Sequence, residues 1–379
     1  MNPNTEFHKI FPMAEWQNTS RPWTEKSLGG AVIAGESLKS ILDLASKEEK
    51  NDWNNLTMSY APIPGSKPLR SQIAKLYPGL SPENIVVFSG AQEAINALYS
   101  VLLTTKNSTV LGLTPCYSPL NNCAKAYGGI LQELPLKLDI DNRWQLDIEK
   151  LLTQLEEQKP NILTVNFPHN PTGYLPTPLE WDSITEACAK NKVTLISDEV
   201  FRGLEFSQSP QIEPACLKIP HSFSLRSISK AFGGQALRIG WVATQRKEDI
   251  EKLTTVKRYF SVCPSALDDF LATILLRNRA HILKKNNRKL HDQSQILKDM
   301  FSDCPLLNIP LPAAGPVCFP NLENTSDAQE FCLNFLKETG LRLEPGFSFG
   351  PHFSSHFRLS IGGDNLEKNL GLLKKFIKK

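Results

Sequence analysis

Short apolar segments alternate with helical segments through the middle of this chain. NIVVFSG, STVLGLTP, NILTVNFP, VTLISDEV and HSFSLRSI are short and largely apolar, as buried strands are. Three segments between these strands have apolar residues at helical spacing: AQEAINALYSVLL, SPLNNCAKAYGG and PLEWDSITEACAKN. Strands that are apolar on both sides must be covered on both faces, and parallel neighbours need a crossover of helix length. The alternation therefore predicts an α/β fold whose sheet is mostly parallel and covered by helices.

The pattern changes after Trp241. Long helical stretches are predicted at about 245–300, and a Pro-rich segment follows from Pro305 to Pro320. The C-terminal part predicts an α+β unit, with a helix in AQEFCLNFLKETG, strands near LRLEPG and HFRLSIGG, and a last helix. Nearer the N-terminus, helices are predicted at 36–50 and in KPLRSQIAKLY. We expect a large domain at 45–275 and a smaller α+β domain built from both termini, 1–44 and 276–379.

Composition narrows the classes of function. The chain of 379 residues is 41% hydrophobic and 21% charged, with a net charge of +3. No cluster of Lys and Arg is interleaved with aromatic residues, which argues against nucleic acid and anionic membranes as partners. Charged residues interrupt the first thirty positions, and no apolar run is long enough to cross a bilayer. The eight cysteines show no C-x-x-C pair, so we expect a cytoplasmic protein with free thiols and no metal.

Polar and aromatic residues follow several of the predicted strands. In an open parallel sheet, ligands bind at the carboxyl ends of the strands. The residues at such ends are Gly90-Ala91-Gln92, Tyr117, Asn170, Asp198 and Lys230. The first three lie between a strand and a helix, where backbone N–H groups can hold a phosphate.

This set of groups suits pyridoxal phosphate. The cofactor needs a lysine for its Schiff base and a carboxylate that keeps the pyridine nitrogen protonated. It also needs a donor to its ring oxygen, an aromatic stacking partner and several donors to its phosphate. The strand ends provide a candidate for each of these roles.

Eight ordered motifs resemble those of fold-type I pyridoxal-phosphate enzymes of the class I/II aminotransferase group. They are YAPIPGSKPLR, SGAQEAI, TPCYSP, NFPHNPTG, SDEVFRG, SISKAFGGQALRIG, EPGFSFG and FRLSIG, and the resemblance covers about residues 30–375. It implies pyridoxal 5'-phosphate as the cofactor. It also implies an aminotransferase that moves an amino group from an amino acid to a 2-oxo acid.

The resemblance also implies a role for each matching residue. Lys230 is the implied Schiff-base lysine, which moves a proton between the substrate Cα and the cofactor. Asp198 pairs with the pyridinium nitrogen, and Tyr117 stacks on the ring. The implied phosphate ligands are Gly90, Ala91, Gln92, Ser227 and Arg238.

Three further roles concern the substrate and the partner subunit. Asn170 donates to the ring oxygen and lies beside the substrate. Arg358 resembles the clamp for the substrate α-carboxylate, which a planar guanidinium binds through two parallel hydrogen bonds. Tyr60 resembles the tyrosine that crosses the subunit interface to the partner's phosphate, so we expect a homodimer.

One position departs from the family pattern. The family usually has a tyrosine three residues after the aspartate, and here that residue is Phe201. The missing phenol motivates an alternative: elimination, cyclisation or oxidation of a modified amino acid, for example an arginine derivative. A catalytically silent binding protein on the same fold is a third hypothesis, against which Lys230, Asp198, Asn170 and Arg238 argue.

Other residues have simpler interpretations beside the functional ones. His169 could be a base, but we favour a packed turn residue because Lys230 already supplies the base. Trp16 and Trp23 are either core residues or part of a substrate lid formed by residues 7–23. Gln92 could contribute only its backbone.

Overall fold

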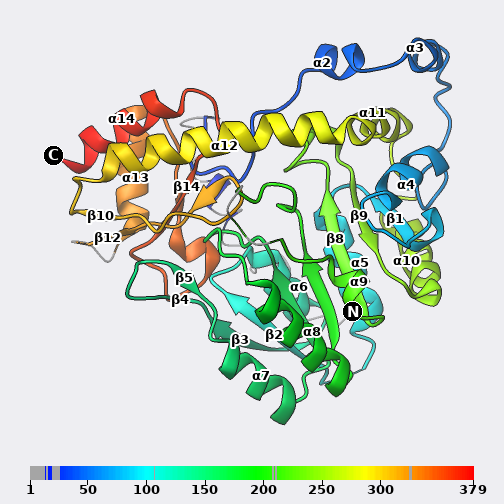
Figure 1. Cartoon of the computed structure of the whole chain (residues 1–379), viewed down its shortest axis with the longest axis horizontal. Coiled ribbons are helices and arrows are strands. Elements are labelled where there is room, and N and C mark those ends of the chain that lie inside the picture. The colour runs from blue at the N-terminus through cyan, green and yellow to red at the C-terminus, as the bar shows by residue number, and fades with distance from the viewer. Residues whose placement is uncertain are drawn as a thin grey trace.

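A seven-stranded sheet forms the centre of the computed structural model, which describes residues 13, 16–18, 26–105, 107–206, 209, 211–323 and 327–379 (Figure 1). In spatial order its strands are β1 (Ile85–Phe88), β9 (Gly240–Ala243), β8 (Ser222–Ser227), β7 (Thr194–Asp198), β6 (Ile162–Asn166), β2 (Thr109–Thr114) and β3 (Ile130–Pro135). Neighbouring strands are parallel except where β9 pairs with β1 and β8. The predicted α/β fold with a mostly parallel sheet is therefore confirmed.

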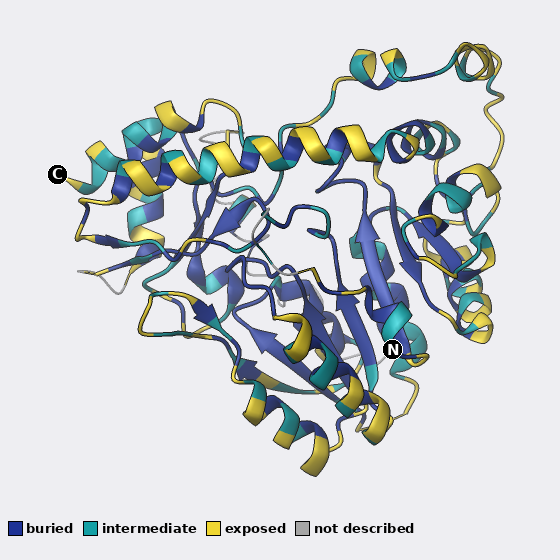
Figure 2. Cartoon of the chain, viewed as in Figure 1, coloured by how far each residue is buried: buried dark blue, intermediate teal, exposed yellow. Residues whose placement is uncertain are grey.

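Helices cover both faces of this sheet because its strands are apolar on both sides. In β6, Ile162 joins one apolar cluster and Leu163 the other, and Ile196 and Leu195 of β7 divide in the same way. The first cluster includes residues of α4 (Lys67–Ala74), α5 (Ala91–Leu102), α6 (Ser118–Ala126), α10 (Lys247–Phe260) and α11 (Ala266–Arg277). The second includes residues of α7 (Ile148–Glu157) and α8 (Pro178–Asn191). Figure 2 shows the buried strands between helices whose outer surfaces are exposed.

The C-terminal part forms a second, smaller unit. Its three-stranded antiparallel sheet has the order β11 (Val317–Cys318), β14 (Phe357–Ser360) and β13 (Glu344–Pro345). The long helix α12 (Arg279–Phe301) runs from α11 to this unit (Figure 1). The other elements of the unit are β10 (Leu307–Asn308), β12 (Asn321–Leu322), α13 (Ala328–Thr339), the 3-10 helix η4 (Gly346–Phe349) and α14 (Leu366–Ile377).

The N-terminal segment joins the C-terminal unit through backbone hydrogen bonds. The Leu28 N–H donates to the Arg342 carbonyl at 2.8 Å, and the Ser360 N–H donates to the Leu28 carbonyl at 2.7 Å. These contacts join the two ends of the chain, and the boundaries 45–275, 1–44 and 276–379 stay a prediction.

The structure corrects one predicted helix and adds elements that the sequence pattern did not predict. The single helix expected at 36–50 is two helices, α2 (Leu38–Asp43) and α3 (Lys47–Asn54). The break occurs because Ser46 starts α3 with a capping box that includes Glu49. The structure also has elements that were not predicted: the strands β3, β9, β10, β11 and β12, the helix α7, and the hairpin of β4 (Lys137–Leu138) and β5 (Trp144–Gln145). The short elements η2 (Pro82–Asn84), η3 (Gln235–Leu237) and α9 (Ala215–Lys218) complete the described structure.

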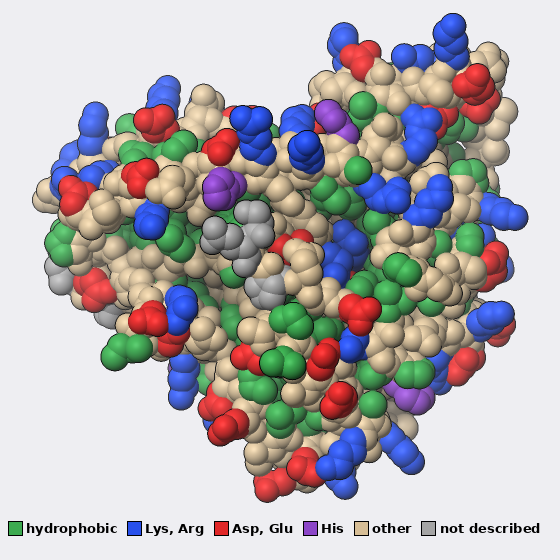
Figure 3. Space-filling view, in the orientation of Figure 1, with side chains coloured by type: hydrophobic (Ala, Val, Ile, Leu, Met, Phe, Trp, Pro, Cys, Tyr) green, Lys and Arg blue, Asp and Glu red, His purple; other side chains and the backbone are tan. Residues whose placement is uncertain are grey.

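The surface carries charges of both signs, and the cysteines are free thiols. Acidic and basic side chains are mixed over the face of the molecule in Figure 3. All eight cysteines are free thiols, and seven of them are buried. Within the described residues, no helix is long and apolar enough to cross a membrane. The same residues contain no group of three or more His, Cys, Asp or Glu side chains that could hold a metal ion.

Candidate active site

Three neighbouring parallel strands end at the candidate site with polar residues. Asn166 ends β6, Asp198 ends β7 and Ser227 ends β8, and Asn166 lies opposite Asp198 in the ladder. The Asn166 amide donates to the Asp198 carbonyl at 2.7 Å, and its oxygen accepts from the Asn170 N–H at 2.7 Å. Asn166 was not among the predicted residues. It fixes the loop that carries Asn170 to the end of the strand that carries Asp198.

A concave backbone turn lies at the start of α5. Gly90 caps this helix with a φ of +89°, and Ala91 and Gln92 form its first turn. The first N–H groups of a helix have no partner within the helix, and the helix dipole favours an anion there. A side chain on Gly240 would lie 2.5 Å from the Ala91 nitrogen, so Gly240 must also lack one. Because Gly240 pairs with Ser227, the turn and the predicted phosphate ligand Ser227 lie close together.

Arg238 closes this turn. Its backbone has a left-handed conformation, with φ of +45° and ψ of +44°, and its Nη1 donates to the Gln235 carbonyl at 3.1 Å. A Cβ atom placed on Gly90 would collide with the Arg238 guanidinium. The predicted phosphate ligands Gly90, Ala91, Ser227 and Arg238 are thus assembled around one cradle, and a side chain at Gly90 would fill it.

We expect Gly90→Ala to weaken phosphate binding. A methyl group at Gly90 would displace the Arg238 guanidinium, so the affinity of the cofactor-free protein for pyridoxamine phosphate should fall about tenfold or more. Gly79→Ala is the matched control because Gly79 has a φ of +90° and no atom within 4 Å of its Cβ position. Both variants carry a similar backbone strain of ~1–2 kcal/mol. Equal affinities in titrations of the two variants would contradict a cradle at Gly90.

Tyr117 lies beside the cradle and is oriented by Gln92. Its hydroxyl donates to the Gln92 side-chain oxygen at 3.0 Å. Burial raises the pKa of Tyr117 to about 12, and the nearby Asp198 charge acts in the same direction. The Gln92 side-chain oxygen is therefore engaged by the phenol, and its NH₂ group lies 3.9 Å from Cys123 Sγ.

Asp198 and Lys230 form the electrostatic centre of the site. Burial raises the pKa of Asp198 to about 7, although its Oδ1 accepts a hydrogen bond from the Val200 N–H at 3.1 Å. Burial also lowers the pKa of Lys230 to about 8, and the Arg358 charge adds to this shift while Asp198 opposes it. A lysine with this pKa is partly neutral near neutral pH, and the neutral amine is the form that attacks a carbonyl. A buried carboxylate such as Asp198 is costly unless it is paired, so a cationic group of a ligand would be stabilised beside it.

The raised pKa of Asp198 predicts a pH-dependent stability for the cofactor-free protein. Between pH 3.8 and about pH 7, the Asp198 carboxyl keeps its proton in the folded protein but has lost it in the unfolded chain. Unfolding then releases a proton, so stability falls as pH rises through this window. Asp198→Asn removes the effect, because an amide does not titrate. From about pH 5 to about pH 7, its melting temperature should rise relative to wild type, on the order of 3 °C. A constant difference would contradict the raised pKa of buried Asp198.

Hydrogen bonds to two other segments of the chain hold the guanidinium of Arg358 in place. Its side chain is 4% exposed, and its Nε donates to the Gly29 carbonyl at 2.8 Å. Its Nη1 donates to the Asn170 side-chain oxygen at 3.0 Å, and the guanidinium carbon lies 4.9 Å from the centre of the Phe349 ring. These contacts leave further guanidinium N–H groups for a substrate carboxylate. They also leave the Asn170 amide NH₂ free to donate, as its predicted role requires.

Glu344 is a buried acid next to Arg358 that the sequence reasoning missed. It is 2% exposed and lies opposite Arg358 in the antiparallel pair of β13 and β14. Burial raises the pKa of Glu344, and the Arg358 charge and hydrogen bonds from Gln17 and Ser348 oppose the shift. The sequence did contain a signal for Glu344: it is the acid that begins the motif EPGFSFG, and that motif lies near FRLSIG in the predicted C-terminal unit.

The N-terminal segment packs against this strand. The Trp16 indole donates to the Leu343 carbonyl at 2.9 Å, and Trp16 is 2% exposed. Trp16 is therefore a core residue, which is the simpler of its two predicted roles. Trp23 and most of the proposed lid at residues 7–23 lie outside the described residues.

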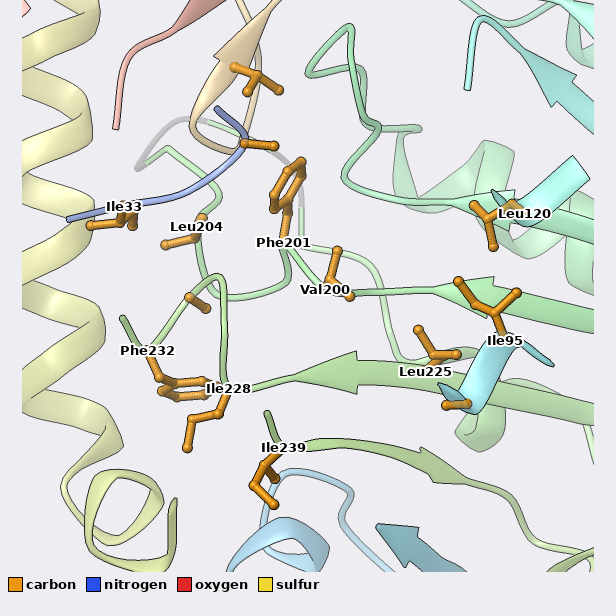
Figure 4. Packing of buried hydrophobic residues seen from close by; sticks show 14 of the residues in the cluster. Ile33, Ile95, Leu120, Val200, Phe201, Leu204, Leu225, Ile228, Phe232 and Ile239 are labelled. Atoms are coloured by element: carbon orange, nitrogen blue, oxygen red, sulfur yellow. The ribbon is translucent and has the colours of Figure 1, made fainter. Parts of the chain in front are cut away.

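His169 and Phe201 are packed residues. His169 is fully buried, its Nδ1 lies 2.7 Å from the Thr172 hydroxyl, and burial lowers its pKa to about 3. This agrees with the packed turn residue that we favoured. Phe201 is also fully buried and lies with Leu204 and Ile33 in the apolar cluster that Figure 4 shows. The ring of Phe201 also packs against Gly315, where a Cβ would lie 3.1 Å from it.

Tyr60 is the predicted site residue that a single chain does not bring to the cradle. It is 87% exposed and lines a pocket of about 370 Å³ with residues of α11 such as Phe270. Met58 and Tyr259 are also strongly exposed, at 81% and 85%.

The comparison with known proteins decides the family. The model of "Aminotransferase class I and II" matches residues 33–374. The chain belongs to this family. A capreomycidine synthase of Streptomyces vinaceus is 25% identical over 325 residues, which cover 85% of this chain and 82% of that protein. The arginine–pyruvate transaminase AruH of Pseudomonas aeruginosa is 26% identical over 314 residues, or 80% and 77% of the two chains. The solved structure of a PLP-dependent aminotransferase from Streptococcus suis superposes with a TM-score of 0.89 at 25% identity and covers 97% of each chain.

Pyridoxal phosphate is the cofactor of this family member, as predicted from the motifs. The residues fit it. The cradle at Gly90 with Arg238 suits the phosphate, and buried Asp198 suits a protonated ring nitrogen. Lys230, with its lowered pKa, suits the covalent anchor.

Proposed function

We propose that the protein is an aminotransferase that moves an amino group from an amino acid to a 2-oxo acid. The observation that carries this proposal is that the charges of Asp198 and Arg358 both act on the Lys230 amine. Asp198 and Arg358 both shift the pKa of Lys230, so the amine lies within electrostatic reach of an acid and of the guanidinium that we assign to the carboxylate. A substrate held at its α-carboxylate would present its Cα near that amine.

Each residue then has a defined task. Pyridoxal phosphate, when bound, supplies a protonated ring that withdraws electrons from the substrate Cα. Asp198 keeps the ring nitrogen protonated, and Lys230 Nζ anchors the cofactor and later moves the proton at the substrate Cα. Arg358 binds the α-carboxylate, while Gly29 and Asn170 hold its guanidinium in place. Gly90, Ala91, Gln92, Ser227 and Arg238 bind the phosphate.

The active unit in this proposal is a homodimer. Exposed Met58, Tyr60 and Tyr259 support it, because large exposed apolar side chains mark interaction surfaces. Tyr60 would reach the phosphate of the partner subunit. An active species that sediments as a monomer would overturn this part of the proposal.

A second candidate function is cyclisation or elimination of a modified amino acid. Phe201 favours it, because no phenol is present at the position where the family usually has one. The relative named capreomycidine synthase gives it further support. The alternatives differ in the fate of the amino nitrogen.

An isotope experiment separates the two functions. The purified protein is incubated with an amino acid whose amino nitrogen is isotopically labelled, together with an unlabelled 2-oxo acid. Arginine with pyruvate is a suitable first pair, given the relative that is named for them. Transfer of the label to a new amino acid supports the aminotransferase. A product that keeps its label, with no labelled second amino acid, would support cyclisation. Loss of the label as ammonia would support elimination.

A further inference from the structure

A buried lysine lies behind the phosphate cradle. Lys257, near the end of α10, has no exposed side-chain surface. Its Nζ donates to the Ser261 hydroxyl at 2.8 Å and lies 3.6 Å from Glu93 Oε2. It also lies 5.3 Å from the centre of the Phe88 ring, at the end of β1. A buried ammonium needs such partners because its desolvation is costly.

Glu93 connects this lysine to the cradle. One oxygen of its carboxylate accepts a hydrogen bond from the Ser89 N–H, directly before Gly90. The other accepts from the Ser261 hydroxyl at 2.6 Å. Glu93 thus holds the turn of Ser89, Gly90 and Ala91 from below, as an acid in the first turn of a helix can.

This arrangement raises an electrostatic problem for a phosphate. A phosphate monoester carries a charge of about −1.5 to −2 at neutral pH, and it binds at the same helix N-terminus as the Glu93 carboxylate. The two anions repel each other, and burial strengthens that repulsion. Lys257, whose Nζ lies 3.6 Å from Glu93 Oε2, supplies a positive charge that compensates this carboxylate. Burial lowers the pKa of Lys257, and the charge and hydrogen bond of Glu93 oppose that shift.

We propose that Lys257 is a positioning residue for the cofactor phosphate, which acts by neutralising Glu93. Glu93 can then hold the turn at Gly90 without repelling the phosphate. This inference rests on cofactor binding by the cradle and is independent of the reaction that the protein catalyses.

The test compares ligands with and without a phosphate. Pyridoxamine phosphate and pyridoxamine are titrated into the cofactor-free protein, because neither forms a covalent bond with Lys230. Lys257→Met should weaken pyridoxamine phosphate at least about tenfold, since the Glu93 charge is then uncompensated, and should leave pyridoxamine unchanged. Lys252→Met is the matched control: Lys252 lies on the same helix, pairs with Asp249 and is 57% exposed. It should change neither affinity.

A double variant isolates the electrostatic effect from the loss of packing. Lys257→Met combined with Glu93→Gln removes both charges, and the amide can still accept from the Ser89 N–H. It should recover most of the lost phosphate affinity. Glu93→Gln alone should bind pyridoxamine phosphate at least as tightly as wild type, and this variant remains informative if Lys257→Met does not fold.

Results of three kinds would overturn the proposal. The first is an unchanged affinity of Lys257→Met for pyridoxamine phosphate. The second is an equal loss for both ligands, which would indicate a general loss of structure. The third is a double variant as weak as Lys257→Met, or Glu93→Gln alone weaker than wild type.

Discussion

Lys230→Ala is expected to lower turnover by about 10²–10⁴-fold or more, because it removes the group that moves the proton at the substrate Cα. The cradle of Gly90, Ser227 and Arg238 does not involve Lys230, so affinity for pyridoxamine phosphate should change little. Lys218→Ala is a suitable control, since Lys218 pairs with Asp182 away from the cradle. Steady-state kinetics and ligand titration of both variants measure these effects. Turnover of Lys230→Ala within tenfold of wild type would assign the proton transfer to another residue.

Arg358→Lys is expected to reduce kcat/KM for an amino acid by about 10²–10³-fold. A lysine cannot form the paired hydrogen bonds of a guanidinium with a carboxylate, and each charged hydrogen bond contributes ~1.5–3 kcal/mol. It also cannot reach both the Gly29 carbonyl and the Asn170 oxygen as Arg358 does.

The matching amino acid amide provides the control for this variant. It lacks the α-carboxylate, so wild type and Arg358→Lys should convert it at similar, low rates. If the variant lost activity equally on the acid and the amide, Arg358 would be a structural residue and the clamp would lie elsewhere.

Strand order along the sequence predicted that several candidate site residues would lie at one edge of the sheet. Asp198, Asn170 and Lys230 follow buried strands, and parallel strands bring their carboxyl ends to one edge of a sheet. Most helices of the large sheet were also predictable from regular apolar spacing, as in α5, although α7 was missed.

The missed features depend on contacts between distant segments. The strand β9 has four residues and begins at Gly240, so it looks like the end of a glycine-rich loop. It is a strand because it pairs with β1 and β8 on its two sides. Glu344 belongs to the site only because β13 pairs with β14.

For other features, the sequence predicted the kind of structure but not its boundaries or its partners. The interval 36–50 has helical spacing, yet the Ser46 capping box divides it, and a local cap outweighs continuous periodicity there. The core role of Trp16 depends on the Leu343 carbonyl, far away in sequence. Periodicity within one segment carries no information about such partners.

Reduction with borohydride followed by peptide mass spectrometry is the most direct test of the site. The protein with bound pyridoxal phosphate is reduced, digested and searched for lysines that carry the cofactor. We predict the modification on Lys230, in the peptide that contains SISKAFGGQALRIG. Modification of a different lysine, or none in protein that shows the bound cofactor's absorbance, would contradict the assignment of Lys230 as the anchor.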